Sequence, residues 1–296
     1  MKNKLFIILI TLSLIPLTAF TAWGNSNECN TENPIVLAHG MAATTDMLGI
    51  VDYWWGIEDA LENKGAEVYK TSVNAMDSTR NKAWNFSSQV EQIIASNEAD
   101  KVNIIAHSHG GLYARDAISN CGLASKVESL TTISSPHRGS SVANLIMYQT
   151  PDAFKDILGD SLDLAYAFIL GDSDPDSKQN GYELCTDYMK NTFNPETPNV
   201  NGVYYQSYAG KNKWSAPNVI MQPTWIYMKA QEGDNDGLVS VDSAQWGDFQ
   251  GVKDAAWWSA GCDHLMEVGH LFGYTPGFDH EGFYQDIASD LKNKGF

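Results

Sequence analysis

The sequence predicts an α/β fold with a largely parallel sheet, and two observations carry this prediction. Short apolar runs typical of buried strands alternate with segments of helical periodicity, from Pro34 to beyond residue 134. Strands and helices that alternate in this way build βαβ units and therefore parallel sheets. At 296 residues, with 43% of them hydrophobic, the chain can bury a large core, and no repeat or linker divides it. We therefore expect residues 25–296 to form one domain.

The predicted elements follow one another at short intervals along the chain. Apolar and alternating runs predict strands, and apolar residues at helical spacing predict helices. The predicted strands are 34–38, 67–71, 102–106, 127–134, 202–208 and 224–228, and the predicted helices are 53–61, 86–96, 112–118 and 283–291.

Residues 143–175 interrupt this alternation with an amphipathic helical segment. Periodicity alone favours an ordinary packed helix. The alternative is a lid, whose apolar face covers an active site until a lipid surface draws it open.

The first 24 residues have the pattern of a secretory signal peptide. Lys2 and Lys4 precede an apolar run at 5–19, and Ala22 and Gly24 are the small residues that suit cleavage. The run is too short to span a bilayer comfortably. We therefore expect cleavage after Gly24 and a soluble protein that is secreted.

The chain is strongly acidic, and this bears on its partners. Its net charge is −17, and removal of residues 1–24 takes away two lysines and no acid. Such a surface repels nucleic acid and anionic membranes. We therefore expect no nucleic-acid partner.

Four cysteines remain after cleavage, and an even number in an exported chain favours disulfides. Cys121 ends the helix that follows the 102–106 strand, and Cys29 lies just before the 34–38 strand. If these strands are parallel neighbours, both cysteines lie at the same edge of the sheet. We therefore expect the pairs Cys29–Cys121 and, by elimination, Cys185–Cys262.

A serine at a strand-to-helix corner is the clearest sign of chemistry. The apolar run 102–106 ends in His107-Ser108-His109-Gly110-Gly111, and a helix is predicted directly afterwards. This is the setting of the G-x-S-x-G nucleophile elbow, with Ala106 in the first glycine position. The alternative is a serine in a purely structural βα turn.

A serine nucleophile needs a base, and the base needs an orienting acid. In hydrolases of this architecture they follow in the chain order Ser, Asp or Glu, His, which favours Asp236 and His264 after Ser108. Asp234 and Asp242 are the alternative acids, and a solvated turn is the structural alternative for this Asp-Asn-Asp-Gly run. The other histidines downstream of the serine are less suitable as the base. His109 lies next to the serine, and His137 comes too early in the chain order. His270 and His280 lie close to the final helix.

Acyl transfer also needs N–H donors that face the developing oxyanion. One donor is expected from the backbone of His109, the residue after the nucleophile. The other is expected from Met41 in the loop after the 34–38 strand, where Gly40 lets the backbone turn.

Along nearly all of residues 25–296, the chain resembles the secreted bacterial family I triacylglycerol lipases of the Pseudomonas and Proteus type. The segments that carry the resemblance are 34–41, 51–57, 106–111, 136–140, 235–239 and 264–268. The resemblance implies an α/β-hydrolase fold with a helical lid at about 143–175, and hydrolysis of acylglycerol esters through an acyl-enzyme. It assigns the catalytic triad to Ser108, Asp236 and His264, and the oxyanion hole to Met41 and His109.

Three departures from the family pattern stand out. Ala106 replaces the first glycine of the elbow, and Asp242 replaces a cysteine of the usual disulfide. The family's structural calcium is held by an aspartate two residues after the catalytic histidine and by another about twenty residues before the catalytic aspartate. Here Met266 takes the first position, and the second falls near Ala216. We therefore expect no structural calcium, no other metal and no cofactor for the chemistry, with a Cys185–Cys262 disulfide anchoring the histidine loop instead.

These observations predict a secreted triacylglycerol lipase that meets a water-insoluble ester at a lipid–water interface and acts as a monomer. The same triad suits a short-chain esterase or a polyester hydrolase, and a silent lipid-binding relative is the alternative outside enzymes. A zinc site built from Cys262, Asp263, His264 and His270 fits no common ligand spacing. Some relatives need a dedicated folding chaperone and others do not, and the sequence leaves this partner open.

Overall fold

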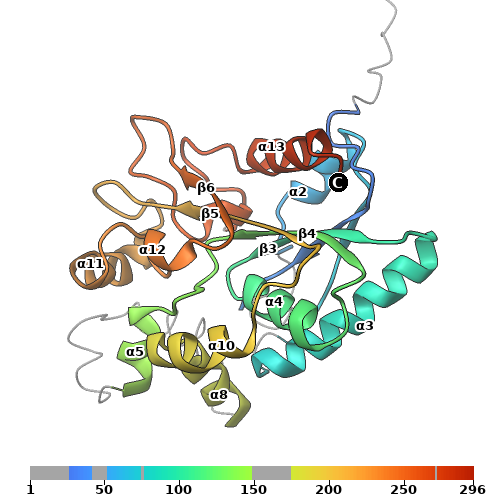
Figure 1. Cartoon of the computed structure of the whole chain (residues 1–296). Coiled ribbons are helices and arrows are strands. Elements are labelled where there is room, and N and C mark those ends of the chain that lie inside the picture. The colour runs from blue at the N-terminus through green and yellow to red at the C-terminus, as the bar shows by residue number, and fades with distance from the viewer. Residues whose placement is uncertain (1–26, 42–51, 75–76, 149–174, 271) are drawn as a thin grey trace, which may run out of the picture.

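The computed structural model describes residues 27–41, 52–74, 77–148, 175–270 and 272–296. Its centre is one six-stranded sheet in the order β2-β1-β3-β4-β5-β6, and all five strand pairs are parallel (Figure 1). The fold class predicted from the sequence is therefore confirmed. The strands are β1 (Ile35–Ala38), β2 (Val68–Lys70), β3 (Val102–His107), β4 (Val127–Ile133), β5 (Tyr204–Gly210) and β6 (Asp248–Lys253).

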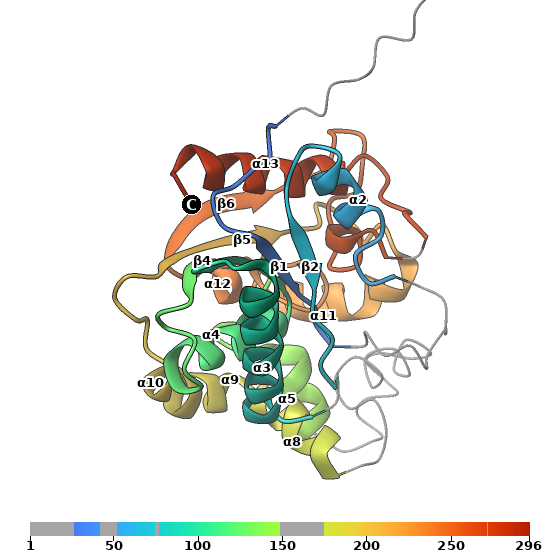
Figure 2. The ribbon, with the colours of Figure 1, turned by 90° about the vertical axis from the view of Figure 1, so that its right-hand side faces the viewer.

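Helices cover both faces of the sheet, as Figures 1 and 2 show from two sides. Successive side chains of a strand point to opposite faces, so Ile35 and Leu37 enter one apolar cluster while Val36 and Ala38 enter the other. Helices α2 (Ile57–Glu62) and α13 (His280–Asn293) cover the first face. Helices α3 (Thr79–Asn97) and α4 (Gly110–Asn120) cover the second. This double cover explains why the central strands read as continuous apolar runs.

The remaining short helices come from the segments that follow β4, β5 and β6. Parallel strands bring their carboxyl ends to the same edge of a sheet, where ligand sites of α/β folds are found. These helices are α5 (Ser141–Tyr148), α8 (Pro175–Glu183), α9 (Thr186–Tyr188), the π-helix η2 (Met189–Phe193), α10 (Asn194–Glu196), the 3₁₀ helix η3 (Val219–Met221), α11 (Gln222–Gln231), α12 (Val241–Ala244) and the 3₁₀ helix η4 (Met266–Val268). None of the helices in the described residues combines the length and apolar content that a membrane crossing requires.

One predicted strand is wrong, because residues 224–228 lie within helix α11. Pro223 suits a helix start, and Met221, Trp225 and Met228 recur at helical spacing on a buried side while Ile226 is exposed. Asp236 therefore follows a helix. The sixth strand is β6, which the sequence did not predict because it is a half-exposed edge strand rich in polar residues.

The two expected disulfides are wrong in this structure. All four cysteines lie within the described residues, and each is a buried free thiol. Cys29 packs in the apolar cluster under α13, whereas Cys121 packs on the opposite face of the sheet beside α4. Cys185 belongs to the cluster of α5 and Cys262 to that of α13. Each expected pair is thus divided between separate clusters, so the shared sheet edge does not bring the sulfurs together.

Two further expectations fall largely outside the described residues. The predicted signal peptide at 1–24 lies wholly outside them. Of the segment 143–175, the structure describes only the end of α5 and the first residue of α8.

Candidate active site

Ser108 occupies the sharp corner between β3 and α4. Its φ is +57°, a left-handed conformation that a non-glycine residue rarely adopts, and its N–H donates to the carbonyl of Ile133 at 2.9 Å. A side chain at Gly110 would overlap the carbonyl of Ala38 on the neighbouring strand, so a glycine is needed there. Ala106, in the first glycine position of the motif, lies fully buried within β3. The corner has the geometry that the nucleophile elbow requires.

The structure joins Asp236 and His264, which lie on separate loops. Nδ1 of His264 and Oδ2 of Asp236 are 2.7 Å apart, and the N–H of His264 donates to the Asp236 carbonyl at 3.0 Å. The other carboxylate oxygen, Oδ1, accepts from the N–H groups of Leu238 and Val239 at 2.8 and 2.7 Å. These bonds fix the orientation of a carboxylate that is fully buried.

The imidazole of His264 presents its other nitrogen without a partner. Nε2 is buried and makes no hydrogen bond within the described part of the chain. The ring of His107, the residue next to Ser108, lies 4.5 Å from the ring of His264. His264 therefore sits against the serine corner with a nitrogen available for a proton.

The alternative acids and bases have other partners. Asp234 is half exposed and pairs with Lys229 and Lys211. His137 contacts Arg115 and Thr132, and His280 lies 2.9 Å from the carbonyl of Trp55. His270 packs edge-on against the ring of Tyr53 with the ring centres 4.7 Å apart. Of the downstream histidines, His264 is the one bound to a candidate acid.

The loop after β1 approaches the serine closely. A Cβ on Gly40 would lie 2.7 Å from Cβ of Ser108 and 2.6 Å from Oη of Tyr53, so a larger residue does not fit. Within the described residues, neither the N–H of Met41 nor that of His109 donates a hydrogen bond. In the described part of the chain, the residue after Ser108 and the residue after Gly40 thus each carry a backbone N–H without an acceptor, as an oxyanion hole requires.

The side chain of His39 shapes this loop. The N–H of Val73 donates to Nε2 at 3.1 Å, so the ring proton is on Nδ1, which donates to the carbonyl of Gly40 at 2.7 Å. Burial lowers the pKa of His39 to about 4, which keeps the ring neutral and this tautomer in place.

A buried brace holds the histidine loop from its other side. The carboxylate of Asp263 accepts from the backbone and side-chain nitrogens of Asn218 at 2.8 to 3.0 Å, and from the N–H groups of Leu265 and Met266. The side chains of Met266 and Ala216 are buried apolar groups and offer no oxygen to a calcium ion. The residues at the family's calcium positions therefore do not fit that ion, whereas Asp263 and Asn218 join the same two segments directly.

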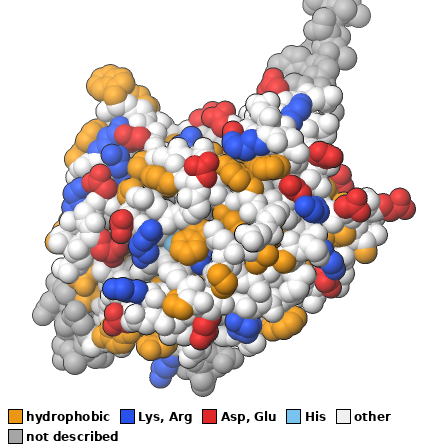
Figure 3. Space-filling model, in the orientation of Figure 1, with side chains coloured by type: hydrophobic (Ala, Val, Ile, Leu, Met, Phe, Trp, Pro, Cys, Tyr) orange, Lys and Arg blue, Asp and Glu red, His pale blue; other side chains and the backbone are white. Residues whose placement is uncertain are grey.

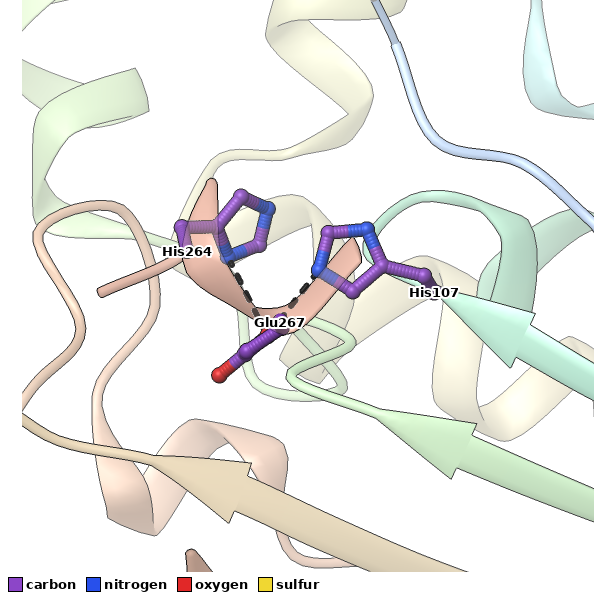
Figure 4. Close-up of side chains that lie close together, drawn as sticks. All are labelled: His107, His264 and Glu267. Atoms are coloured by element: carbon purple, nitrogen blue, oxygen red, sulfur yellow. Dashed lines mark hydrogen bonds and ion pairs between the residues drawn. The ribbon is translucent and has the colours of Figure 1, made fainter. Parts of the chain in front are cut away.

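Glu267 was not predicted as a site residue from the sequence, yet its carboxylate lies close to the candidate base His264. Nε2 of His107 and Oε2 of Glu267 are 2.9 Å apart, and Oε2 lies 4.0 Å from Nδ1 of His264 (Figure 4). One ligand atom from each of the three side chains lies within 4.8 Å of the others, close enough for a metal ion. However, Nδ1 of His264 is already bound to Asp236 and Nε2 of His107 to Glu267. Hydrogen bonds thus account for this group of residues.

A second network missed by the sequence analysis holds the side chain of His109. Lys82 is buried and donates from Nζ to Nδ1 of His109 at 2.9 Å and to Oδ1 of Asn180 at 3.1 Å. Nε2 of His109 then donates to Oγ1 of Thr79 at 2.9 Å. Burial lowers the pKa of Lys82 to about 7. No signal in the sequence pointed to this network, because Lys82 lies outside the predicted helix 86–96 and lysines are rarely fully buried.

Comparison with known proteins identifies the family to which the chain is related. Residues 34–216 match the model of the palmitoyl protein thioesterase family. The chain is 32% identical over 266 residues to triacylglycerol lipase 2 of Saccharomyces cerevisiae, which covers 83% of this chain and 75% of the yeast protein. It is 29% identical over 323 residues to a triacylglycerol lipase of Vibrio cholerae, over 99% of both chains. The solved structure of a metagenomic carboxyl esterase superposes with a TM-score of 0.68 at 16% identity, covering 88% of this chain and 76% of the esterase, which shows a shared fold.

These findings support the wider lipase relationship implied by the sequence motifs, without singling out the Pseudomonas and Proteus type. The family model spans more than half of the chain, and the yeast lipase aligns with most of it. The chain belongs to the palmitoyl protein thioesterase family, and it is an ester hydrolase of the lipase type.

Proposed function

We propose that this protein is a secreted triacylglycerol lipase that works through an acyl-enzyme on Ser108. The observation that carries the proposal is the 2.7 Å contact of Asp236 with His264, whose ring lies 4.5 Å from that of His107 beside Ser108 and whose Nε2 has no partner among the described residues. The names of the yeast and Vibrio relatives favour triacylglycerol as the substrate. The pattern of residues 1–24 is the basis for secretion.

In this proposal Oγ of Ser108 attacks the ester carbonyl while Nε2 of His264 takes its proton. Asp236 holds the imidazole in the tautomer that leaves Nε2 free and stabilises the imidazolium that forms. The N–H groups of Met41 and His109 receive the oxyanion, and each such donor is worth roughly 3 kcal/mol. His264 then returns the proton to the departing alcohol, and water releases the acyl group by the same steps.

Exposed aromatic side chains support a lipid–water interface as the partner. Trp257 and Trp258 precede the histidine loop and Phe272 and Tyr274 follow it, and their exposed fractions range from 56% to 86%. On the face shown in Figure 3, hydrophobic side chains are interspersed among charged ones and one protrudes at the upper left corner. Tryptophan and tyrosine favour the boundary between water and lipid.

The test is a comparison of rates on four substrates: emulsified long-chain triacylglycerol, tributyrin, a polyester film and a palmitoyl thioester. We expect the highest rate on the triacylglycerol emulsion, and a loss of at least about 10³-fold in Ser108→Ala on every ester. Equal activity of Ser108→Ala and the parent protein would overturn the mechanism.

The family match favours thioester cleavage as the second candidate, and a preference for the palmitoyl thioester would replace the triacylglycerol assignment. Trp257→Ser should lower the rate on the emulsion and leave a soluble ester unaffected. Trp84→Ser is the matched control, since this exposed tryptophan lies on α3.

A further inference from the structure

A buried chain of polar side chains lies behind the candidate site and takes no part in the proposed chemistry. Oη of Tyr53 is 2.6 Å from Nδ1 of His107, and Nε2 of His107 is 2.9 Å from Oε2 of Glu267. Oγ of Ser134, at the end of β4, donates to Oε1 of Glu267 at 2.6 Å. His107 and Glu267 are at most 1% exposed, so no solvent competes for these bonds.

One end of this chain touches the candidate base. The carboxylate of Glu267 lies between the imidazoles of His107 and His264, as Figure 4 shows, and its Oε2 is 4.0 Å from Nδ1 of His264. The rings of His107 and His264 are 4.5 Å apart and tilted by 41°. His264 thus packs against both members while its own hydrogen bond goes to Asp236.

The other end touches the loop that carries Met41. Oη of Tyr53 lies 2.6 Å from where a Cβ of Gly40 would be, and the ring of Tyr53 is 5.7 Å from the ring of His39. Residues 39–41 follow β1, whereas Ser108 follows β3 and His264 lies near the end of the chain. Tyr53, His107 and Glu267 therefore connect loops that the sheet itself does not join.

The protons in this chain have one consistent arrangement. Burial lowers the pKa of His107 well below its usual value, so the ring is neutral and carries one proton. Burial raises the pKa of Tyr53, so its hydroxyl keeps its proton and donates to Nδ1 of His107. The ring proton of His107 is then on Nε2 and donates to Glu267.

Glu267 and Asp236 are both close to His264, but their environments differ. Burial raises the pKa of Glu267 well above its usual value, and the nearby Asp236 adds to this shift. Asp236 instead has two backbone N–H groups on its free oxygen. Asp236 is therefore the carboxyl group that orients His264, whereas Glu267 accepts from His107 and Ser134.

We propose that Tyr53, His107 and Glu267 are positioning residues, which hold the loop of Gly40 and Met41 and the loop of His264 in one hydrogen-bonded frame. This inference rests on the proposed function, because it assumes that these two loops supply the oxyanion donor and the base. Removing a link lets the two loops shift relative to each other. The loss then falls on the chemical step, since a displacement of about 1 Å can cost roughly 10²-fold in rate.

The first test removes one hydroxyl and compares it with a matched deletion. Tyr53→Phe should lower kcat on a soluble ester roughly tenfold and leave KM within about twofold. Tyr284→Phe is the control, because Tyr284 is fully buried in the same apolar cluster and its hydroxyl has no partner among the described residues. Its kcat and KM should stay within about twofold of the parent values. Equal kcat values for the two variants would overturn the proposal.

The second test asks whether the links act as a unit. Glu267→Gln should also lower kcat, and the double variant with Tyr53→Phe should lose about as much as the worse single variant. If the two losses multiply, the links are independent and the frame is wrong. Should Glu267→Gln fail to fold, Ser134→Ala replaces it, because this change removes the donor from Oε1 of Glu267, together with the acceptor of the Gly210 N–H.

A readout without turnover separates this inference from the proposed function. The Nδ1 proton of His264, bound to Asp236, should give a downfield ¹H NMR signal that shifts in Tyr53→Phe and stays in place in Tyr284→Phe. An unmoved signal in Tyr53→Phe contradicts the frame even in an active enzyme. If the signal shifts in Tyr53→Phe but the parent protein cleaves no ester, the proposed function alone is contradicted.

Discussion

His107 and His109 flank Ser108, yet their side chains enter two different networks. In the acidic network His107 bonds to Glu267 and lies against the ring of His264, which is bound to Asp236. In the lysine network His109 accepts from Lys82, a buried lysine of α3 whose pKa burial lowers to about 7. In the proposed reaction positive charge develops on the base and negative charge on the oxyanion. The acidic network therefore lies on the side of the base, and the lysine network lies on the side of the oxyanion donor His109.

The two networks also differ in the elements that they join. The acidic network connects β3, β4 and the histidine loop, which lie around the sheet edge. The lysine network connects α3 to Asn180 on α8, and the N–H of Thr79 on α3 donates to Oε2 of Glu183 on α8 at 2.7 Å. The base side is thus built on the sheet, whereas the nucleophile side depends on two helices remaining docked. The predictions that follow test this difference, from the largest expected effect to the smallest.

The largest effect is expected from Asp236→Asn on the base side. The amide cannot hold the imidazolium, and it favours the wrong tautomer of His264, so kcat should fall about 10⁴-fold. Steady-state kinetics on a soluble ester measure this loss. Asp234→Asn is the control, since Asp234 pairs with surface lysines, and it should leave kcat within about twofold. Comparable losses in the two variants would contradict the assignment of the acid.

Lowering the pH should lower the free energy of unfolding through both networks, because each of them contains a buried neutral histidine. Burial lowers the pKa of His39 and of His270 from 6.5 to about 4, and it lowers those of His107, His109 and His137 well below 6.5. Below pH 6.5 these histidines therefore bind more protons in the unfolded chain than in the folded chain, so the stability falls as the pH falls. Each histidine contributes ~1.4 kcal/mol per pH unit between pH 6.5 and its folded pKa. The raised pKa values of Asp263 and Glu267 act in the opposite direction, but five histidines outnumber two carboxyls.

Urea unfolding at pH 7, 6 and 5 measures this dependence. The unfolding free energy should decline steadily over that range. His270→Phe removes one titrating ring and should make the decline shallower. A free energy that does not change between pH 7 and 5 would contradict this account.

Lys82→Met tests the nucleophile side by itself. The variant removes the Nζ donor from Nδ1 of His109 and from Oδ1 of Asn180, and the loss of these two buried hydrogen bonds should cost about 2–3 kcal/mol of stability. Because the sheet-built base side stays intact, kcat per folded molecule should fall far less than in Asp236→Asn. Lys126→Met, which breaks an exposed pair with Glu91, should cost no more than ~0.5 kcal/mol. The prediction fails if the two lysine variants have the same unfolding midpoint.

The smallest effect is expected from removal of calcium. Asp263 and Asn218 join the histidine loop to the 216–218 segment through protein hydrogen bonds. A chelator should therefore leave the Tm and the esterase rate unchanged. Asn218→Ala, which removes the side-chain donor, should cost about 1–2 kcal/mol. A Tm that falls with chelator and recovers with calcium would show that the brace is not sufficient.

Much of the fold could be predicted because the central strands are covered on both faces. β1 and most of β3 read as apolar runs for this reason, and the corner at Ser108 follows directly from β3. Helix α11 was misread because its aromatic run between Trp225 and Met228 suits a strand equally well over a short window. The edge strand β6 lacks an apolar face and gives no such signal.

The candidate site was predictable in its order along the chain but not in its supports. Ser108, Asp236 and His264 follow the chain order of such hydrolases, and the structure joins the last two although the predicted strand before Asp236 is a helix. Glu267 and Lys82 gave no usable pattern, because a single charged residue in an element is ordinarily solvated. Their partners are distant in sequence, so only the folded chain brings them together.

The four thiols give three apolar clusters of the core a reporter of local opening. Cys29 and Cys262 lie in the cluster under α13, Cys121 beside α4 and Cys185 beside α5. Burial raises the pKa of Cys29, Cys121 and Cys185 to about 11, so a thiol reagent reacts only when the surrounding cluster opens to water. Alkylation rates at the four sites, resolved by mass spectrometry, would therefore rank the free energies of opening of the three clusters in one experiment.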